Sequence, residues 1–170
     1  MFLSLFLHLV KLSICPYLTY TVNTLNTNRS LLVYCAGDGS SAQPGKFFHL
    51  DSSGDRNEPA AQRTAAQFWR MVAGEEGGRE GGKVEAVRGC PQQENGYDCG
   101  MYVLSMTKYL AHLYVTEGGK EGGKEGEPKL DTTGLVARVT PDAIDEARRR
   151  IRLKVQQLAA GAGAGGGASR

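Results

Sequence analysis

CPQQENGYDCGMYVL, residues 90–104, places a cysteine between a polar, turn-forming run and a strongly apolar segment. The apolar residues predict a helix over 100–114 that is buried on nearly every side. Cys99 therefore lies at a helix N-terminus, where the helix dipole favours the thiolate that attacks carbonyl carbons. Gln93, six residues earlier, has an amide that is able to donate a hydrogen bond to an oxyanion. The stretch predicts the nucleophile half of a cysteine hydrolase, and the alternative is a buried, unreactive cysteine.

The same stretch resembles the active-site signature of the Ulp-type, or sentrin-specific, cysteine proteases, which remove ubiquitin-like modifiers from proteins. The resemblance is carried by Pro91-Gln92-Gln93, Asn95-Gly96 and Asp98-Cys99-Gly100, followed by the apolar run. Residues 97–103 are most similar to the deneddylase branch, and the likeness covers about residues 30–160. It implies a cysteine-type peptidase that processes or removes a ubiquitin-like modifier after its Gly-Gly terminus. Whether the modifier is of the neddylation type or of the SUMO type stays open.

Around the signature, β-favouring runs alternate with segments of helical periodicity. This alternation indicates mixed α and β structure, and we expect the first two strands to pair antiparallel. The resemblance implies the papain-like α+β fold, in which a small sheet packs on the helix that carries the cysteine. The predicted strands are 31–35, 46–51 and 83–87, and the predicted helices are 58–72, 100–114 and 140–159.

The composition divides the chain into unlike parts. Residues 1–29 contain no glycine and no acidic residue, and we expect an anomalous apolar segment that does not match the family. The N-terminal part of the papain-like fold has no counterpart there, so we expect it to be missing. Residues 30–160 form the predicted protease domain, which is partial. It has Gly-rich insertions at 75–83 and 117–128, and a disordered Gly/Ala-rich tail follows at 161–170.

Charge and cysteine usage limit the expected partners. The net charge is +2, and the basic cluster at 148–154 is explained as a solvated helix face. We therefore expect neither nucleic acid nor a membrane as partner, but a monomer that binds a ubiquitin-like modifier and its conjugates. The cysteines Cys15, Cys35, Cys90 and Cys99 show no metal-ligand spacing, so we expect no metal and no cofactor. They suit a reducing compartment, which predicts cytoplasmic and/or nuclear localisation.

The resemblance also assigns the catalytic residues by position. It implies Cys99 as the nucleophile, Gln93 as the oxyanion-hole donor and Asp51 as the aspartate that orients a histidine. That histidine is the general base of cysteine proteolysis. In the family it begins a His-Trp-Ser string, but Asn28 and Arg29 occupy the corresponding positions here. An asparagine amide does not accept a proton near neutral pH.

Two other histidines lie in the protease-like region, and neither is a good replacement for the base. His49 lies two residues before Asp51, so both side chains point to the same face of a strand. We expect a structural role for His49, because active relatives share it and also have the proper base. His112 follows Cys99 by thirteen residues, several helical turns away. Two hypotheses follow: a thiol isopeptidase, or a catalytically inactive remnant that binds a modifier.

Overall fold

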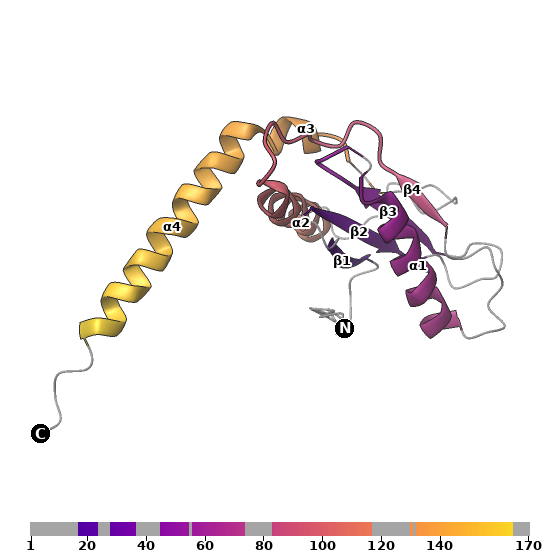
Figure 1. Ribbon diagram of the computed structural model, residues 1–170, viewed down its shortest axis with the longest axis horizontal. Helices are drawn as coiled ribbons and strands as arrows, with labels where there is room; N and C mark the ends of the chain where they lie inside the picture. Colours follow the sequence, from indigo (N-terminus) through magenta and orange to yellow (C-terminus); the bar gives the residue numbers. More distant parts are fainter. Residues whose placement is uncertain are drawn as a thin grey trace, which may run out of the picture.

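A four-stranded sheet with helices on both faces forms the body of the described part of the chain (Figure 1). The computed structural model describes residues 17–23, 28–36, 45–54, 56–73, 83–116, 130 and 132–164, with the backbone alone for 17–23, 72–73 and 162–164. The strands are β1 (Tyr17–Asn23), β2 (Arg29–Cys35), β3 (Lys46–Leu50) and β4 (Val84–Ala86). The helices are α1 (Glu58–Ala73), α2 (Cys99–Thr116), α3 (Leu135–Arg138) and α4 (Pro141–Ala164).

The strands follow one another across the sheet in chain order. β2 pairs antiparallel with β3, with Val33 opposite Phe48, so the predicted pairing of the first two predicted strands is confirmed. β3 pairs parallel with β4, with Phe48 opposite Glu85. A parallel pair requires a long crossover connection, and α1 lies in the chain between these two strands. The mixed sheet and its helices confirm the α+β class.

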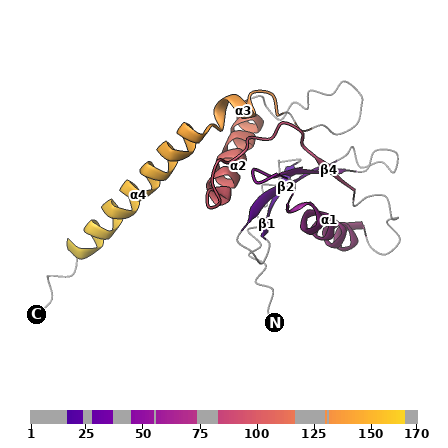
Figure 2. The same ribbon diagram turned by 45° about the horizontal axis from the view of Figure 1, so that its top comes forward.

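Each face of the sheet has its own hydrophobic core, because alternate strand residues point to opposite sides. Leu31 and Val33 pack with α2 on one face, whereas Leu32 and Phe47 pack with α1 on the other. Figure 2 shows α1 and α2 on opposite sides of the sheet. The α2 core also contains Cys35, Phe48, Leu50, Cys90, Tyr102, Val103, Met106, Leu110, Leu135, Val139 and Ile144. The α1 core also contains Ala61, Ala65 and Phe68, with Trp69 packed against it. Odd-numbered residues of β2 therefore face the helix that begins at Cys99.

β1 differs from the expectation for residues 1–29. That segment is expected to have no place in the domain, yet Tyr17–Asn23 pairs antiparallel with β2 from Tyr17 opposite Cys35 to Asn23 opposite Arg29. The physical reason is β-propensity, since YLTYTVN is rich in threonine, tyrosine and valine. A strand at the edge of a sheet gains its backbone hydrogen bonds from one neighbour alone. Residues 1–16 lie outside the described part.

The predicted helices are present, with shifted ends. The last one begins as expected, because the Thr140 hydroxyl oxygen accepts a hydrogen bond from Ala143 N at 3.2 Å, as in an N-cap. It continues to Ala164, four residues into the predicted tail. The short helix α3 is not predicted. The two predicted insertions lie outside the described residues except for Lys83. Among the described helices, none has the length and apolarity needed to cross a membrane.

Candidate active site

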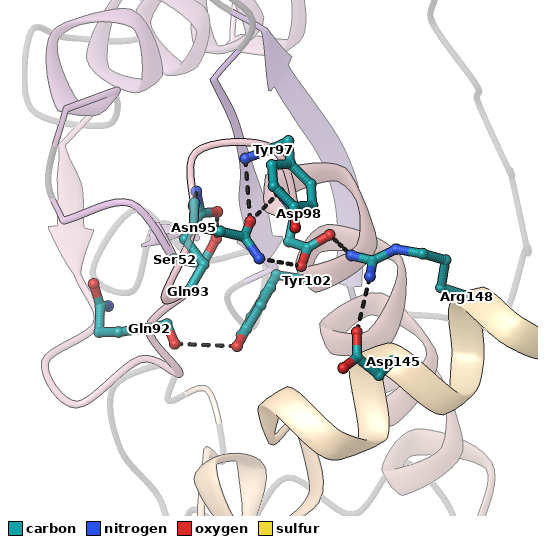
Figure 3. A network of polar contacts seen from close by, with 9 residues as sticks. All are labelled: Ser52, Gln92, Gln93, Asn95, Tyr97, Asp98, Tyr102, Asp145 and Arg148. Atoms are coloured by element: carbon teal, nitrogen blue, oxygen red, sulfur yellow. Dashed lines mark hydrogen bonds and ion pairs between the residues drawn. The ribbon is translucent and has the colours of Figure 1, made fainter.

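The loop before Cys99 is organised by one asparagine. Asn95 Oδ1 accepts hydrogen bonds from Tyr97 N at 3.2 Å and from Asp98 N at 3.0 Å, and Asn95 Nδ2 donates to Asp98 Oδ2 at 2.6 Å (Figure 3). This local pattern is an Asx turn, which the Asn-Gly composition of the loop favours. Asp98 then takes the N-cap position of α2, because Tyr102 N donates to Asp98 O at 3.0 Å. The turn thus places Cys99 as the first residue of the helix.

Gln93 is held so that one amide N–H remains for a further acceptor. Gln93 Nε2 donates to Asn95 O at 2.5 Å, and Gln93 Oε1 accepts from the Ser52 hydroxyl at 3.0 Å. These partners define the orientation of the amide, since a carbonyl oxygen accepts only. The Gln93 backbone N–H also donates to Ser52 O at 2.8 Å. An amide nitrogen carries two hydrogens, and the bond to Asn95 uses one of them. The second Gln93 N–H is able to donate a hydrogen bond to an oxyanion.

Asp51 is buried at the end of β3 and is joined to the glutamine segment. Its two carboxylate oxygens accept hydrogen bonds from Ser53 N at 2.9 Å and from Asn57 N at 3.0 Å. Its backbone oxygen accepts from Gln92 Nε2 at 3.0 Å. The structure therefore brings Asp51, Gln93 and the loop that leads to Cys99 into one hydrogen-bonded assembly. A carboxylate offers about four lone-pair positions, so acceptor capacity remains for an imidazole N–H.

Tyr102 anchors this assembly to α2. Tyr102 lies about one helical turn after Cys99, and its hydroxyl donates a hydrogen bond to Gln92 O at 3.1 Å (Figure 3). Burial raises the pKa of Tyr102, and the negative charges of Glu94 and Asp145 raise it further. The phenol therefore stays protonated and remains a donor across the neutral range. Cys99 itself is 4% exposed.

A contact from α4 reaches Asp98, the residue before Cys99. The guanidinium of Arg148 forms an ion pair with the buried carboxylate of Asp98 and a second one with Asp145, at 2.8 Å. It also lies over the ring of Tyr97, with Cζ 5.6 Å from the ring centroid (Figure 3). Sequence reasoning misses this role, because Arg148 belongs to a run of three arginines that look alike. The only local signal is its spacing of three residues from Asp145.

Arg29 is the first residue of β2, and its side chain lies beside the start of α2. This agrees with the position of the other odd-numbered residues of β2, which face α2. Arg29 Nη1 is 3.1 Å from the place that a Cβ on Gly100 would occupy. A glycine at this position therefore makes room for the guanidinium beside the nucleophile-bearing turn. Asn28, which the resemblance assigns to the histidine position, directly precedes Arg29 in the chain. The side chain that reaches this end of the helix is thus a permanent cation and not a proton acceptor.

His49 is unsuited to act as the base for Cys99. It is 2% exposed, and its Nε2 is 2.8 Å from the Ser30 hydroxyl. Strand alternation places it on the side of the sheet that faces α1, whereas Cys99 begins the helix on the other side. The expected structural role therefore agrees with its position. His112 lies on α2 about 20 Å along the axis from Cys99, at 1.5 Å per residue.

Asp51→Asn is expected to destabilise the fold by about 2 kcal/mol. The substitution replaces one of two charge-assisted acceptors by an amide nitrogen, which faces a backbone N–H. Urea unfolding followed by circular dichroism measures the effect. The matched control is Asp142→Asn, the same change at an exposed carboxylate in the first turn of α4. A loss no larger than that of the control would contradict this structural role of Asp51.

Part of the chain matches a known protein family. Residues 41–119 match the Ulp1 protease family, C-terminal catalytic domain. This part of the chain is therefore similar to the Ulp1 protease family, and the resemblance based on the Asp98-Cys99 motif is confirmed. Asn28 and Arg29 precede the matched segment. Among the described residues, no group of three or more histidine, cysteine, aspartate or glutamate side chains is placed to hold a metal ion.

Similar individual proteins point to one branch of the family. Sentrin-specific protease 8 of Homo sapiens is 38% identical over 89 residues, which are 52% of this chain and 37% of the relative. The Mus musculus protein of the same name is 38% identical over 85 residues, covering 49% of this chain and 34% of the relative. A probable sentrin-specific protease 8 of Dictyostelium discoideum is 35% identical over 76 residues, 40% of this chain and 31% of the relative. The chain thus spans about a third of the length of the curated relatives it matches.

One solved structure is also similar, the Xanthomonas campestris effector protein XopD bound to ubiquitin. The likeness covers 77% of this chain and 60% of that chain, at 21% sequence identity and a TM-score of 0.47. At this level of similarity the neighbour carries no argument about the site or its substrate.

Proposed function

We propose that the site around Cys99 belongs to a cysteine peptidase that cleaves after the Gly-Gly terminus of a ubiquitin-like modifier. The expected modifier is the one used in neddylation, since the relatives above are sentrin-specific protease 8 proteins. The observation that carries the proposal is the assembly of Gln93, Asp51 and the Cys99 loop through side-chain and backbone hydrogen bonds. An inert buried cysteine does not require such an arrangement.

The proposed reaction assigns one role to each residue. The Cys99 thiolate attacks the carbonyl carbon of the modifier's terminal glycine, and the second Gln93 N–H and the Cys99 backbone N–H stabilise the oxyanion. The C–N bond then breaks, and the leaving amine takes a proton from a histidine that Asp51 orients. Water hydrolyses the resulting thioester. The histidine is expected at position 28, where this chain has asparagine.

A second candidate is a catalytically inactive protein that binds a modifier without cleaving it. Arg29 beside Gly100 and Asn28 at the histidine position favour this candidate. The two candidates share the same cellular setting. We propose the cytoplasm and/or the nucleus, since the four cysteines of the sequence show no metal-ligand spacing and suit a reducing compartment.

A modifier-derived electrophilic probe separates the two candidates. The neddylation modifier with a reactive group at its C-terminus is expected to form an adduct at Cys99 if the site is that of an active thiol peptidase. Cys99→Ala, and separately Cys90→Ala as a matched control on another buried thiol, identify the labelled residue. An inactive binder predicts reversible binding, measured by fluorescence anisotropy, and no adduct.

Parallel probes made from the SUMO-type modifier and from ubiquitin test the specificity. A stronger reaction with the neddylation probe is the expected result. Preference for the SUMO-type probe would keep the peptidase class and contradict the deneddylase assignment. If the protein neither binds nor forms an adduct with any of the three probes, the proposed function is contradicted. Sequencing the messenger RNA directly upstream of the Ser30 codon supplies the complementary test, since an active enzyme predicts a His-Trp string there.

A further inference from the structure

The outer half of α4 is an arm that extends away from the domain. The helix has 24 residues and is therefore about 36 Å long. Its base is held by Ile144, which is 1% exposed in the α2 core, and by Arg148 through its ion pair with Asp98. Every residue from 149 to 161 is exposed. Figures 1 and 2 both show this part of the helix projecting away from the sheet and from α1.

Three large aliphatic side chains form a narrow stripe along the arm. Ile151, Val155 and Leu158 are 48%, 59% and 62% exposed, and they are spaced four and three residues apart. At about 100° per residue they lie within roughly 60° of one another. The stripe continues the line of Ile144, which is buried in the domain. Leu153 is 52% exposed and lies on the opposite side of the helix, so it is not part of the stripe.

Basic residues border the stripe on both sides. Arg152 lies on one side of it, and Lys154 and Arg150 lie on the other, each about 70 to 110° from the centre of the stripe. Arg150 shares the Glu146 carboxylate with Arg149, whereas the turns from 151 to 160 contain no acidic residue. The arm therefore presents an apolar seam between two positive borders. The prediction that residues 148–154 are a solvated helix face accounts for the basic residues but not for the apolar seam between them.

The charges decide which occupant fits this seam. Two copies of the arm would bring positive borders against positive borders whether the helices were parallel or antiparallel, so self-pairing is disfavoured. A membrane-binding helix uses a wide apolar face with aromatic anchors, whereas this seam is narrow and holds no aromatic residue. A helix whose own apolar seam is bordered by aspartate and glutamate satisfies both the packing and the charges.

We propose that residues 149–160 of α4 form a docking surface for an acidic amphipathic helix of a partner protein. The surface goes beyond the proposed peptidase function, because it lies outside the assembly around Cys99 and does not require cleavage. Three turns of helix form a small interface, so we expect transient binding with a Kd on the order of 10 µM.

A synthetic helix tests the surface chemistry directly. The probe is a three-heptad peptide with isoleucine and leucine at its seam and glutamate at both borders, and its binding to the full chain is measured by fluorescence anisotropy. The comparison peptide has lysine at both borders and is expected to bind at least ~10-fold more weakly. Equal binding of the two peptides would overturn the proposal. So would the absence of binding by the glutamate peptide at concentrations well above the expected Kd.

Two substitutions on opposite sides of the same helix provide the matched pair. Val155→Glu is expected to weaken peptide binding at least ~10-fold, whereas Leu153→Glu leaves it within about 2-fold. Both sites are exposed to a similar degree, and circular dichroism verifies that each variant folds. Equal losses in the two variants would overturn the proposal. Arg152→Glu with Lys154→Glu is expected to reverse the preference toward the lysine peptide.

Two further measurements address the other occupants. Flotation with vesicles that contain phosphatidylserine measures membrane binding. We expect that Val155→Glu does not reduce it. Sedimentation equilibrium is expected to show a monomer at concentrations around the Kd for the peptide. Vesicle binding or self-association that Val155→Glu abolishes and Leu153→Glu preserves would assign the seam to that occupant and overturn the proposal.

Discussion

Asn28→His is expected to raise the rate of cleavage of a fluorogenic modifier substrate by about 10²- to 10⁴-fold, the range of general acid–base catalysis. Under the proposed function, the loop already places Cys99 and Gln93, and Asn28 occupies the position that the resemblance assigns to the proton acceptor. A histidine there supplies an imidazole that accepts the thiol proton and returns it to the leaving amine. The measurement is the initial rate on the C-terminal amide of the neddylation modifier.

The design of this experiment separates chemistry from binding. Asn28→Gln keeps an amide at the position and is expected to leave the rate at the wild-type value. Asn28→His combined with Cys99→Ala is expected to lose the gained activity, which shows that the thiol is the nucleophile. Arg29 lies beside Gly100, so Asn28→His with Arg29→Trp, which restores the family string, is expected to gain more than the single change. A folded Asn28→His variant that binds the modifier with no gain in rate would contradict the assignment of position 28.

Arg148→Ala is expected to destabilise the fold by about 2–3 kcal/mol. The Asp98 side chain is 7% exposed, so removing the guanidinium leaves a buried carboxylate with Asn95 as its remaining side-chain donor. Breaking one side of a buried ion pair costs roughly 3–5 kcal/mol. The lower value is expected here because Arg148 is 31% exposed and water is able to replace part of its charge. Chemical denaturation of the two proteins measures the difference.

The neighbouring arginine is the control for this prediction. Arg149→Ala removes the same type of side chain from the same helix, but Arg149 pairs only with the exposed Glu146 among the contacts of the described residues. Its expected effect is within about 0.5 kcal/mol. In a double-mutant cycle, Asp98→Ala is expected to recover part of the loss caused by Arg148→Ala, because no buried charge is then left unpaired. Equal effects of the two arginine substitutions would contradict the role of Arg148.

Much of the fold follows from short stretches of sequence. The runs that become β2, β3 and β4 are rich in β-favouring residues, and the segment of α2 is apolar on most sides. Their secondary structure is therefore readable from propensity and periodicity. β1 is not predicted, because a strand needs a neighbouring strand to pair with, and a single short stretch of sequence does not show that partner. The apolar residues before it also dominate the composition of residues 1–29. The C-terminal end of α4 is also misplaced, since a Gly/Ala stretch carries no clear stop signal.

For the candidate site, the sequence by itself determined the turn before Cys99 and the position of Gln93 six residues earlier. The Asx turn of Asn95 and the N-cap position of Asp98 rest on residues within a few positions of Cys99, so local chemistry is sufficient to predict them.

Only the tertiary structure decided what approaches that loop. It brings Arg148 from α4 onto Asp98, places Arg29 beside Gly100 and turns His49 to the far side of the sheet. These contacts join residues that are distant in the chain, and they follow from strand alternation and helix packing, which no short stretch of sequence contains.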